Sequence, residues 1–182
     1  MMQKENCYNN NKLVIKKIIV GMLDTNCYIL ENNNECLIID PGSEAEKIKS
    51  SISKNVVCIL ITHRHFDHIG ALDELSNYYK VKVYDKSNLK EGINSIGTFK
   101  FVVQYNLGHT MDSISYIFND IMFSGDFIFK GSIGRCDLGG DYVLMKESIK
   151  KIINSDINYE IYPGHGDKTY LTDELDNIKV YL

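Results

Sequence analysis

The alternation of hydrophobic and polar positions divides this chain into strands and helices. Residues 13–20 alternate and are rich in β-branched side chains, whereas residues 56–62 form an almost continuous apolar run, typical of a strand covered on both faces. The other predicted strands cover residues 27–31, 35–40, 81–84, 99–105, 113–118, 121–123 and 160–162, and the predicted helices cover residues 43–53, 67–79, 142–153 and 173–180. This order predicts a layered α/β architecture with sheets inside and helices outside.

Two of the helix starts are predicted from capping residues. Ser43, with Glu46 three residues later, resembles a capping box. Asp67 is expected to cap a helix that continues to about residue 79, whose apolar positions 69, 72 and 75 share one face.

All five histidines of the chain follow predicted strands. Three of them fall within residues 63–68, directly after the apolar run, and single histidines follow the strands at 99–105 and 160–162. Loops at the carboxyl ends of strands in an open α/β sheet converge on a common crevice. We therefore expect one site built from His63, His65, Asp67, His68, His109, Asp126 and His165.

The spacing within residues 63–68 predicts two ligand directions. His63 and His65 are two residues apart in extended chain, so their side chains point to the same side and can bind one ion. Asp67 and His68 come where the chain turns into a helix, and they face another direction, suited to a second ion. The carboxylate of Asp126 has two oxygens with which to bridge two cations.

Imidazole and carboxylate donors suit zinc, non-haem iron or manganese. The cluster contains no cysteine, which argues against a structural zinc-finger site. A single-ion alternative stays open, since His63, His109 and Asp126 form the facial set that non-haem iron oxygenases use. Interpretations without a metal also stay open. Residues 63–68 could be a polar loop with a helix cap, Asp126 could be a turn residue, and His109 or His165 could be an ordinary surface or core residue.

Composition limits the classes of partner. A chain of 182 residues predicts one domain over residues 1–182. Its net charge of −4 would not attract phosphate backbones, so we expect no nucleic-acid partner. No apolar run reaches the roughly 18 residues of a membrane span. Residues 1–12 lack an apolar signal region, and the scattered cysteines favour reduced thiols in a cytoplasm. These are Cys7, Cys27, Cys36, Cys58 and Cys136, of which the middle three are expected to be core residues.

Several motifs resemble the metallo-β-lactamase superfamily. They are Thr-His-Arg-His-Phe-Asp-His at 62–68, Gly-His-Thr at 108–110, Ser-Gly-Asp at 124–126 and Tyr-Pro-Gly-His-Gly at 162–166. The Gly-Ser-Ile-Gly-Arg-Cys-Asp segment at 131–137 is similar to the hydroxyacylglutathione hydrolase (glyoxalase II)-like branch. Asp167 departs from the pattern, because the family has a tyrosine there, and the chain ends at Leu182 before the helical region that follows in glyoxalase II.

The resemblance implies a four-layer αββα sandwich with a binuclear site. One ion would lie on His63, His65 and His109 and the other on Asp67, His68 and His165, with Asp126 bridging them. It also implies that a basic residue at position 135 contacts the thiol part of the substrate. Arg135 is equally well interpreted as part of a salt bridge that fixes its loop.

The resemblance predicts a hydrolase for small-molecule thioesters that uses two divalent ions, zinc first among them. Zinc lowers the pKa of bound water to about 7, and a thiol with a pKa near 8.5 leaves as thiolate without a strong general acid. Asp67 is expected to orient the attacking hydroxide, and residues 131–140 form either a loop over the site or a plain connector. The rivals are a mononuclear iron persulfide dioxygenase, a non-catalytic binding module and a nuclease, all on the same scaffold.

Overall fold

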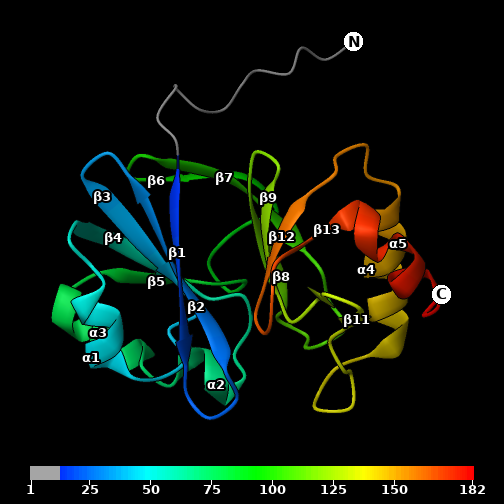
Figure 1. The fold of residues 1–182 in the computed structure, drawn as a ribbon, viewed down its shortest axis with the longest axis horizontal. Coiled ribbons are helices and arrows are strands. Elements are labelled where there is room, and N and C mark those ends of the chain that lie inside the picture. The colour runs from blue at the N-terminus through cyan, green and yellow to red at the C-terminus, as the bar shows by residue number, and fades with distance from the viewer. Residues whose placement is uncertain (1–12) are drawn as a thin grey trace.

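Two β-sheets face each other in the computed structural model, which describes residues 13–182 (Figure 1). The first sheet has the order β1-β2-β3-β4-β5: Val14–Val20, Thr25–Asn32, Glu35–Ile39, Asn55–Leu60 and Lys82–Tyr84. The second has the order β13-β12-β9-β8-β7-β6: Thr169–Tyr170, Glu160–Pro163, Ile121–Gly125, Ile114–Phe118, Phe99–Tyr105 and Gly92–Ile96. The strands β10 (Ile128–Phe129) and β11 (Ser132–Ile133) form a separate small hairpin.

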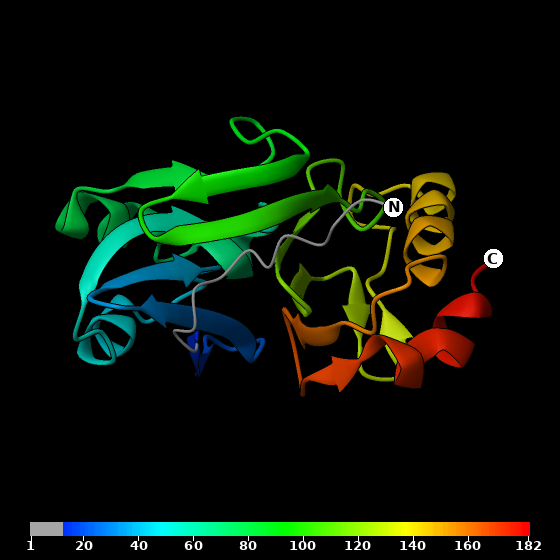
Figure 2. The same cartoon turned by 90° about the horizontal axis from the view of Figure 1, so that it is seen from above.

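Helices cover the outer face of each sheet. Helices α1 (Ala45–Ser50) and α3 (Leu72–Tyr79) pack on the first sheet, and α4 (Tyr142–Ile153) and α5 (Leu171–Lys179) pack on the second. The short α2 (Phe66–Ile69) lies beside β2. The view from above shows the two helical layers at opposite ends with the sheets between them (Figure 2). The predicted four-layer αββα sandwich is confirmed.

Alternating side chains of the strands fill three separate cores. In β2, Cys27 and Ile29 pack outward toward α1 and α3, whereas Tyr28 and Leu30 pack inward against the second sheet. A third core lies between the second sheet and α4 and α5. A strand buried on both faces loses its polar alternation, which is why residues 56–62 read as one apolar run. Cys27, Cys36 and Cys58 are buried free thiols as predicted, and Cys7 lies outside the described residues.

Strand directions bring the predicted ligand segments to one edge. Strand β3 is parallel to β4, and β12 is parallel to β9. Strands β7 and β9 are both antiparallel to β8, so β7, β9 and β12 share one direction. The segments that carry His109, Asp126 and His165 therefore leave the second sheet at the same edge.

Both predicted helix caps are wrong. Helix α1 begins after Glu44, whose left-handed backbone (φ 54°) precludes the capping box, and no side chain caps it. The helix expected from Asp67 to residue 79 is two helices, because the Ala71 amide donates to the carbonyl of Pro41, 2.9 Å away, at the break. The Asp67 carboxylate instead accepts a hydrogen bond from the Thr25 hydroxyl at 2.9 Å.

The sequence pattern missed the strands β6, β10, β11 and β13. β6 is half-exposed and polar, and it exists through its antiparallel pairing with β7. The others are two residues long and are set by their partners. None of the helices within residues 13–182 is long and apolar enough to cross a membrane. The prediction of one domain over residues 1–182 stays a prediction.

Candidate metal centre

The seven predicted ligands form two clusters that meet at one carboxylate. The donor atoms of His63, His65 and His109, which we call the first cluster, lie within 4.8 Å of one another. Those of Asp67, His68 and His165, the second cluster, do the same. Each cluster takes residues from the segment that runs from the end of β4 into α2 and from the second sheet's edge.

Asp126 lies between the two clusters. Its Oδ2 is 3.5 Å from Nε2 of His109 in the first cluster and 3.5 Å from Nε2 of His165 in the second. Its Oδ1 is 3.3 Å from Nε2 of His68. A Cβ on Gly164 would come within 2.1 Å of Oδ1, so glycine is required there for the carboxylate to reach this position. The bridging position inferred from the sequence is therefore available to Asp126.

Three histidines are held from outside by main-chain carbonyl groups. In each, the ring nitrogen that faces away from the clusters donates to a carbonyl oxygen. The bonds are His109 Nδ1 to Arg135 (2.6 Å), His65 Nε2 to Leu138 (3.2 Å) and His165 Nδ1 to Leu23 (3.0 Å). Such bonds fix the tautomer and leave the inner nitrogen as an electron-pair donor.

The other two histidines are held by a buried pair that the sequence analysis missed. Asp40 Oδ2 accepts from His68 Nδ1 at 3.0 Å and from the Thr62 hydroxyl at 2.6 Å. The Thr62 oxygen in turn lies 3.1 Å from His63 Nδ1. One carboxylate thus orients His68 directly and His63 through Thr62, so it reaches both clusters.

A signal for Asp40 was present in the sequence. It follows the buried strand β3, as Asp126 follows β9, and β3 is parallel to β4. The rule that a polar side chain at the carboxyl end of a buried strand faces the crevice selects it without any histidine nearby in the sequence.

The clusters leave polar atoms that only a further group would satisfy. His63 Nε2, His68 Nε2 and Asp126 Oδ1 are buried and have no hydrogen-bond partner among the described residues. Buried polar atoms without partners are costly, so native proteins rarely leave them. Tetrahedral zinc with bonds of about 2.0–2.1 Å keeps its ligand atoms roughly 3.3 Å apart, close to the separations around Asp126. The residues present therefore fit divalent ions.

The clusters differ in the charge that they favour. Burial opposes protonation of His68, but the carboxylates of Asp126 and Asp40 raise its pKa to about 10. The pKa of His165 is raised to about 10 by Asp126 and Asp67, against the same effect of burial. In the first cluster, burial lowers the pKa values of His63 and His109. The second cluster thus attracts positive charge, and the first keeps its imidazoles neutral, the form that binds metals.

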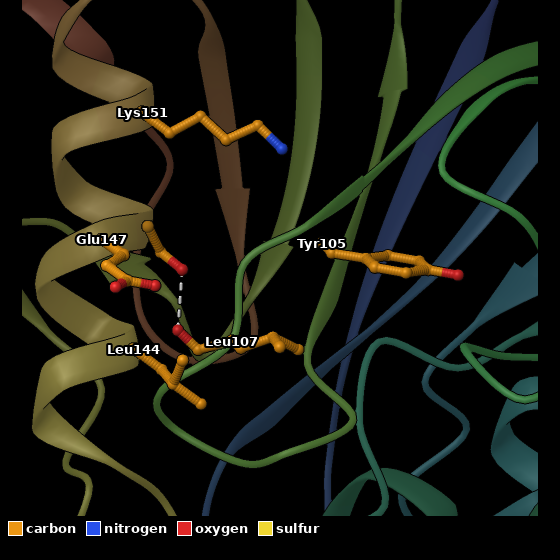
Figure 3. A pocket seen from close by; sticks show the side chains of 6 residues that line it. Tyr105, Leu107, Leu144, Glu147 and Lys151 are labelled. Atoms are coloured by element: carbon orange, nitrogen blue, oxygen red, sulfur yellow. Dashed lines mark hydrogen bonds between the residues drawn. The ribbon is translucent and has the colours of Figure 1, made fainter.

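Helix α4 sets the position of His109. The Asp141 amide at the start of α4 donates to the carbonyl of Gly108 at 2.8 Å. The Ser148 hydroxyl donates to the carbonyl of Leu107 at 2.7 Å, the dashed line in Figure 3. Gly108 has φ 137°, and a Cβ there would lie 2.4 Å from Cα of Met145. This close approach lets the chain turn under α4 and direct His109 into the cluster.

A cavity of about 740 Å³ opens onto both clusters. Residues 132–135 and Leu138 line it, so the glycine-rich segment contributes a wall of the site. Arg135 also lines the cavity, and its side chain is paired with Asp137, with Nε 2.5 Å from Oδ1 and a second contact from Nη2 to Oδ2. The predicted salt bridge at Arg135 is present, and its contact with substrate stays a prediction.

Comparison with known proteins decides the family. The profile of the metallo-beta-lactamase superfamily matches residues 20–85 and 81–165. The chain belongs to this superfamily. Superfamily membership and the two His/Asp clusters support a divalent-metal centre, with the identity of the metal open.

Two relatives cover most of the chain. The probable metallo-hydrolase YqgX of Bacillus subtilis (strain 168) is 32% identical over 88% of this chain and 94% of its own length. The hydroxyacylglutathione hydrolase GloC of Haemophilus influenzae (strain ATCC 51907 / DSM 11121 / KW20 / Rd) is 28% identical with the same coverage. These superfamily relatives support assignment of the chain as a hydrolase.

Three solved structures share the fold. BLEG-1, a B3 metallo-beta-lactamase, aligns with a TM-score of 0.80 and 33% identity over 90% of this chain and 97% of its own. TTHA1623, solved in a di-iron-bound form, aligns with a TM-score of 0.79 and 28% identity over 87% and 96%. ETHE1 from Myxococcus xanthus has a TM-score of 0.79 at 23% identity over 88% and 81%, a likeness of fold alone.

Proposed function

We propose that this protein is a glyoxalase II-like thioesterase, a metal-dependent hydrolase that cleaves S-acyl thiol esters. The observation that carries the proposal is the pair of clusters that share Asp126, in which all five histidines are oriented from outside. This arrangement suits two divalent ions better than one. The likeness to GloC supports the choice of thioesters among the superfamily's substrates.

The proposed ligands are His63, His65 and His109 for one ion and Asp67, His68 and His165 for the other, with Asp126 shared. Divalent ions bound there would lower the pKa of water and polarise a carbonyl group. Zinc is the first candidate, and iron and manganese suit the same donors.

The chain's own residues orient the reaction. Asp67, whose carboxylate is fixed by Thr25 at 2.9 Å, faces the cavity, and we assign it the role of directing the attacking oxygen toward the thioester carbonyl. The oxygen of a hydroxide ion bonds to the carbonyl carbon, and the carbon–sulfur bond breaks with its electron pair going to sulfur. The carboxylic acid and thiolate that form exchange a proton to give a carboxylate and a thiol. The thiol leaves as thiolate because its pKa is near 8.5, so no further acid is needed.

The remaining expectations belong to this proposal. A small-molecule thioester is the expected partner, and the net charge of −4 supports the absence of nucleic acid from the list of partners. The four buried free thiols in the described part of the chain suit a cytoplasmic location.

The test is elemental analysis of the purified protein followed by assay of the metal-loaded form. We expect about two ions per chain and hydrolysis of S-lactoylglutathione or simpler thioesters. A single iron with oxygen uptake on a persulfide substrate would instead establish the dioxygenase rival. His65→Ala should abolish turnover while the circular-dichroism spectrum stays that of the parent, and turnover that persists in metal-free His65→Ala would refute the proposal.

A further inference from the structure

The cavity over the metal centre has an apolar wall. Five residues with large apolar side chains line it: Leu23, Phe66, Phe129, Ile133 and Leu138. Phe66 is 74% exposed, Leu138 56% and Leu23 53%. Large apolar side chains grouped around one opening, rather than scattered singly, mark a surface that a ligand covers.

Apart from the proposed ions, the described residues of the cavity wall offer no free cation to the two carboxylates of a glutathione thioester, one of which the ammonium group of that molecule already balances. Among the described residues that line it, Arg135 is the one with a permanent positive charge, and Asp137 already neutralises it. The carboxylates of Asp67 and Asp126 face the clusters. Glutathione thioesters carry two free carboxylates, which would find no unpaired cation on this wall.

Three lysines gather instead in a different pocket, beside Tyr28 and Tyr162. Lys17 Nζ donates to the carbonyl of Gly166 at 3.1 Å, and Lys168 is paired with Glu160. These two charges are therefore engaged outside the catalytic cavity.

We propose that the substrate is a neutral thioester with an apolar acyl chain that lies against this wall. The inference rests on the proposed thioesterase function and narrows its substrate class. Burying a methylene group favours binding by about fourfold, so affinity rises with chain length until the wall is covered. A charged tripeptide thiol adds no affinity in this cavity.

The apolar wall can be tested by side-chain substitutions that keep the main-chain carbonyl groups that orient two of the histidines. Leu23 and Leu138 line the cavity, and their carbonyl oxygens orient His165 and His65. Replacement of either side chain by serine removes apolar surface and retains the carbonyl group. Val180→Ser is the matched control, because Val180, at the end of α5, is 76% exposed and does not line the cavity.

Binding is measured with the metal-loaded protein and non-hydrolysable thioethers. S-ethyl, S-butyl and S-hexyl N-acetylcysteamine are titrated by calorimetry beside S-ethylglutathione. We expect two- to fourfold tighter binding per methylene in the parent and in Val180→Ser. The dependence on chain length should flatten in Leu23→Ser and Leu138→Ser. S-ethylglutathione should bind no better than the neutral S-ethyl compound.

Turnover separates this inference from the proposed function. Acetyl, butyryl and hexanoyl N-acetylcysteamine and S-lactoylglutathione are compared by kcat/KM. A rise with chain length supports the inference, whereas a preference of tenfold or more for S-lactoylglutathione, or tighter binding of S-ethylglutathione, overturns it. If no thioester is hydrolysed, the proposed function fails, and the thioether titration still decides whether the wall binds apolar chains.

Discussion

The two ligand clusters are built from similar donors but are held in different ways. The first cluster is all histidine, and main-chain carbonyls of the segment around residues 135–138 orient two of its three rings. The second contains a carboxylate, and the buried Asp40 orients His68 directly. The second cluster is therefore the more negative. We expect it to bind its ion first and more tightly.

The largest effect should come from the residue that the clusters share. Asp126→Ala removes an oxygen from both, so we expect kcat/KM to fall at least about 10³-fold and the metal content to fall to one ion per chain or fewer. Mass spectrometry under native conditions measures the content. Asp120→Asn, a change at an exposed carboxylate, is the control. Two tightly bound ions in Asp126→Ala would show that the clusters do not depend on the bridge.

Asp40 and Thr62 distinguish the clusters directly. Asp40→Asn retains the left-handed backbone (φ 50°), which asparagine tolerates, but removes the charge beside His68. In a competition with a chelator, we expect the affinity for the more tightly held ion, which we assign to the second cluster, to fall about 10–100-fold.

Thr62→Val removes the link to His63 and leaves the Asp40–His68 bond. It should weaken chiefly the binding of the less tightly held ion in the chelator competition, by about tenfold. Equal weakening of the binding of both ions in both variants would mean that the two clusters act as one unit.

Glu174 supports the first cluster from a distance. It is buried and accepts hydrogen bonds from the Thr169 hydroxyl at 2.6 Å and from the Gly131 amide at 2.7 Å, where the segment that orients His109 begins. Burial raises the pKa of Glu174, but these bonds and one from Asn177 outweigh it, so the pKa lies below its ordinary value.

A lowered pKa in the folded state stabilises the protein above the unfolded value of about 4.3, and the stabilisation is lost as the pH falls through the folded value. Glu174→Gln should therefore lower the free energy of unfolding by about 1–2 kcal/mol at pH 7. The difference from the parent should shrink below about pH 4. Thermal melts across pH test this, with exposed Asp173→Asn as the control. A deficit that persists unchanged at pH 3 would exclude the charge as its cause.

The smallest effect is expected at the contact between α4 and the His109 segment. Ser148→Ala removes the bond to the Leu107 carbonyl, which should cost about 1 kcal/mol and lower Tm by about 2–4 °C. Ser50→Ala, at a local bond within α1, should change Tm less. An unchanged Tm in Ser148→Ala would show that the Gly108 packing alone positions this segment.

Much of the fold could be predicted because elements that are buried on one face have apolar residues at regular intervals in the sequence. The long strands and α4 appear near their predicted bounds, since apolar positions repeat with the period of each element. The polar β6 was missed because it depends on its partner β7 rather than on its own residues. The capping box failed because Ser43 and Glu46 fit a local rule that the turn at Glu44 overrides.

The candidate ligands could be selected from the sequence, whereas most of the groups that hold them could not. Histidines are rare and reveal themselves by spacing, so the seven candidate residues were found together. Asp40 has no histidine spacing to mark it and could be selected only by its place after the buried strand β3. The role of Thr62 arises from the pairing of β3 with β4, which brings its hydroxyl to Asp40. No sequence shows which main-chain carbonyl groups accept hydrogen bonds from the histidines, because every residue carries one. Here they are those of Leu23, Arg135 and Leu138.

Each cluster takes ligands from both halves of the sandwich, since the segment after β4 belongs to the first sheet and His109, Asp126 and His165 follow strands of the second. Bound ions would therefore cross-link the two halves in addition to taking part in the reaction. Since an ion that binds only the folded chain stabilises it by mass action, metal supply and resistance to unfolding become linked. In a cell poor in the metal, the protein would be inactive and would also have a lower free energy of unfolding. It would then be cleaved more readily by proteases at the interface between its two sheets.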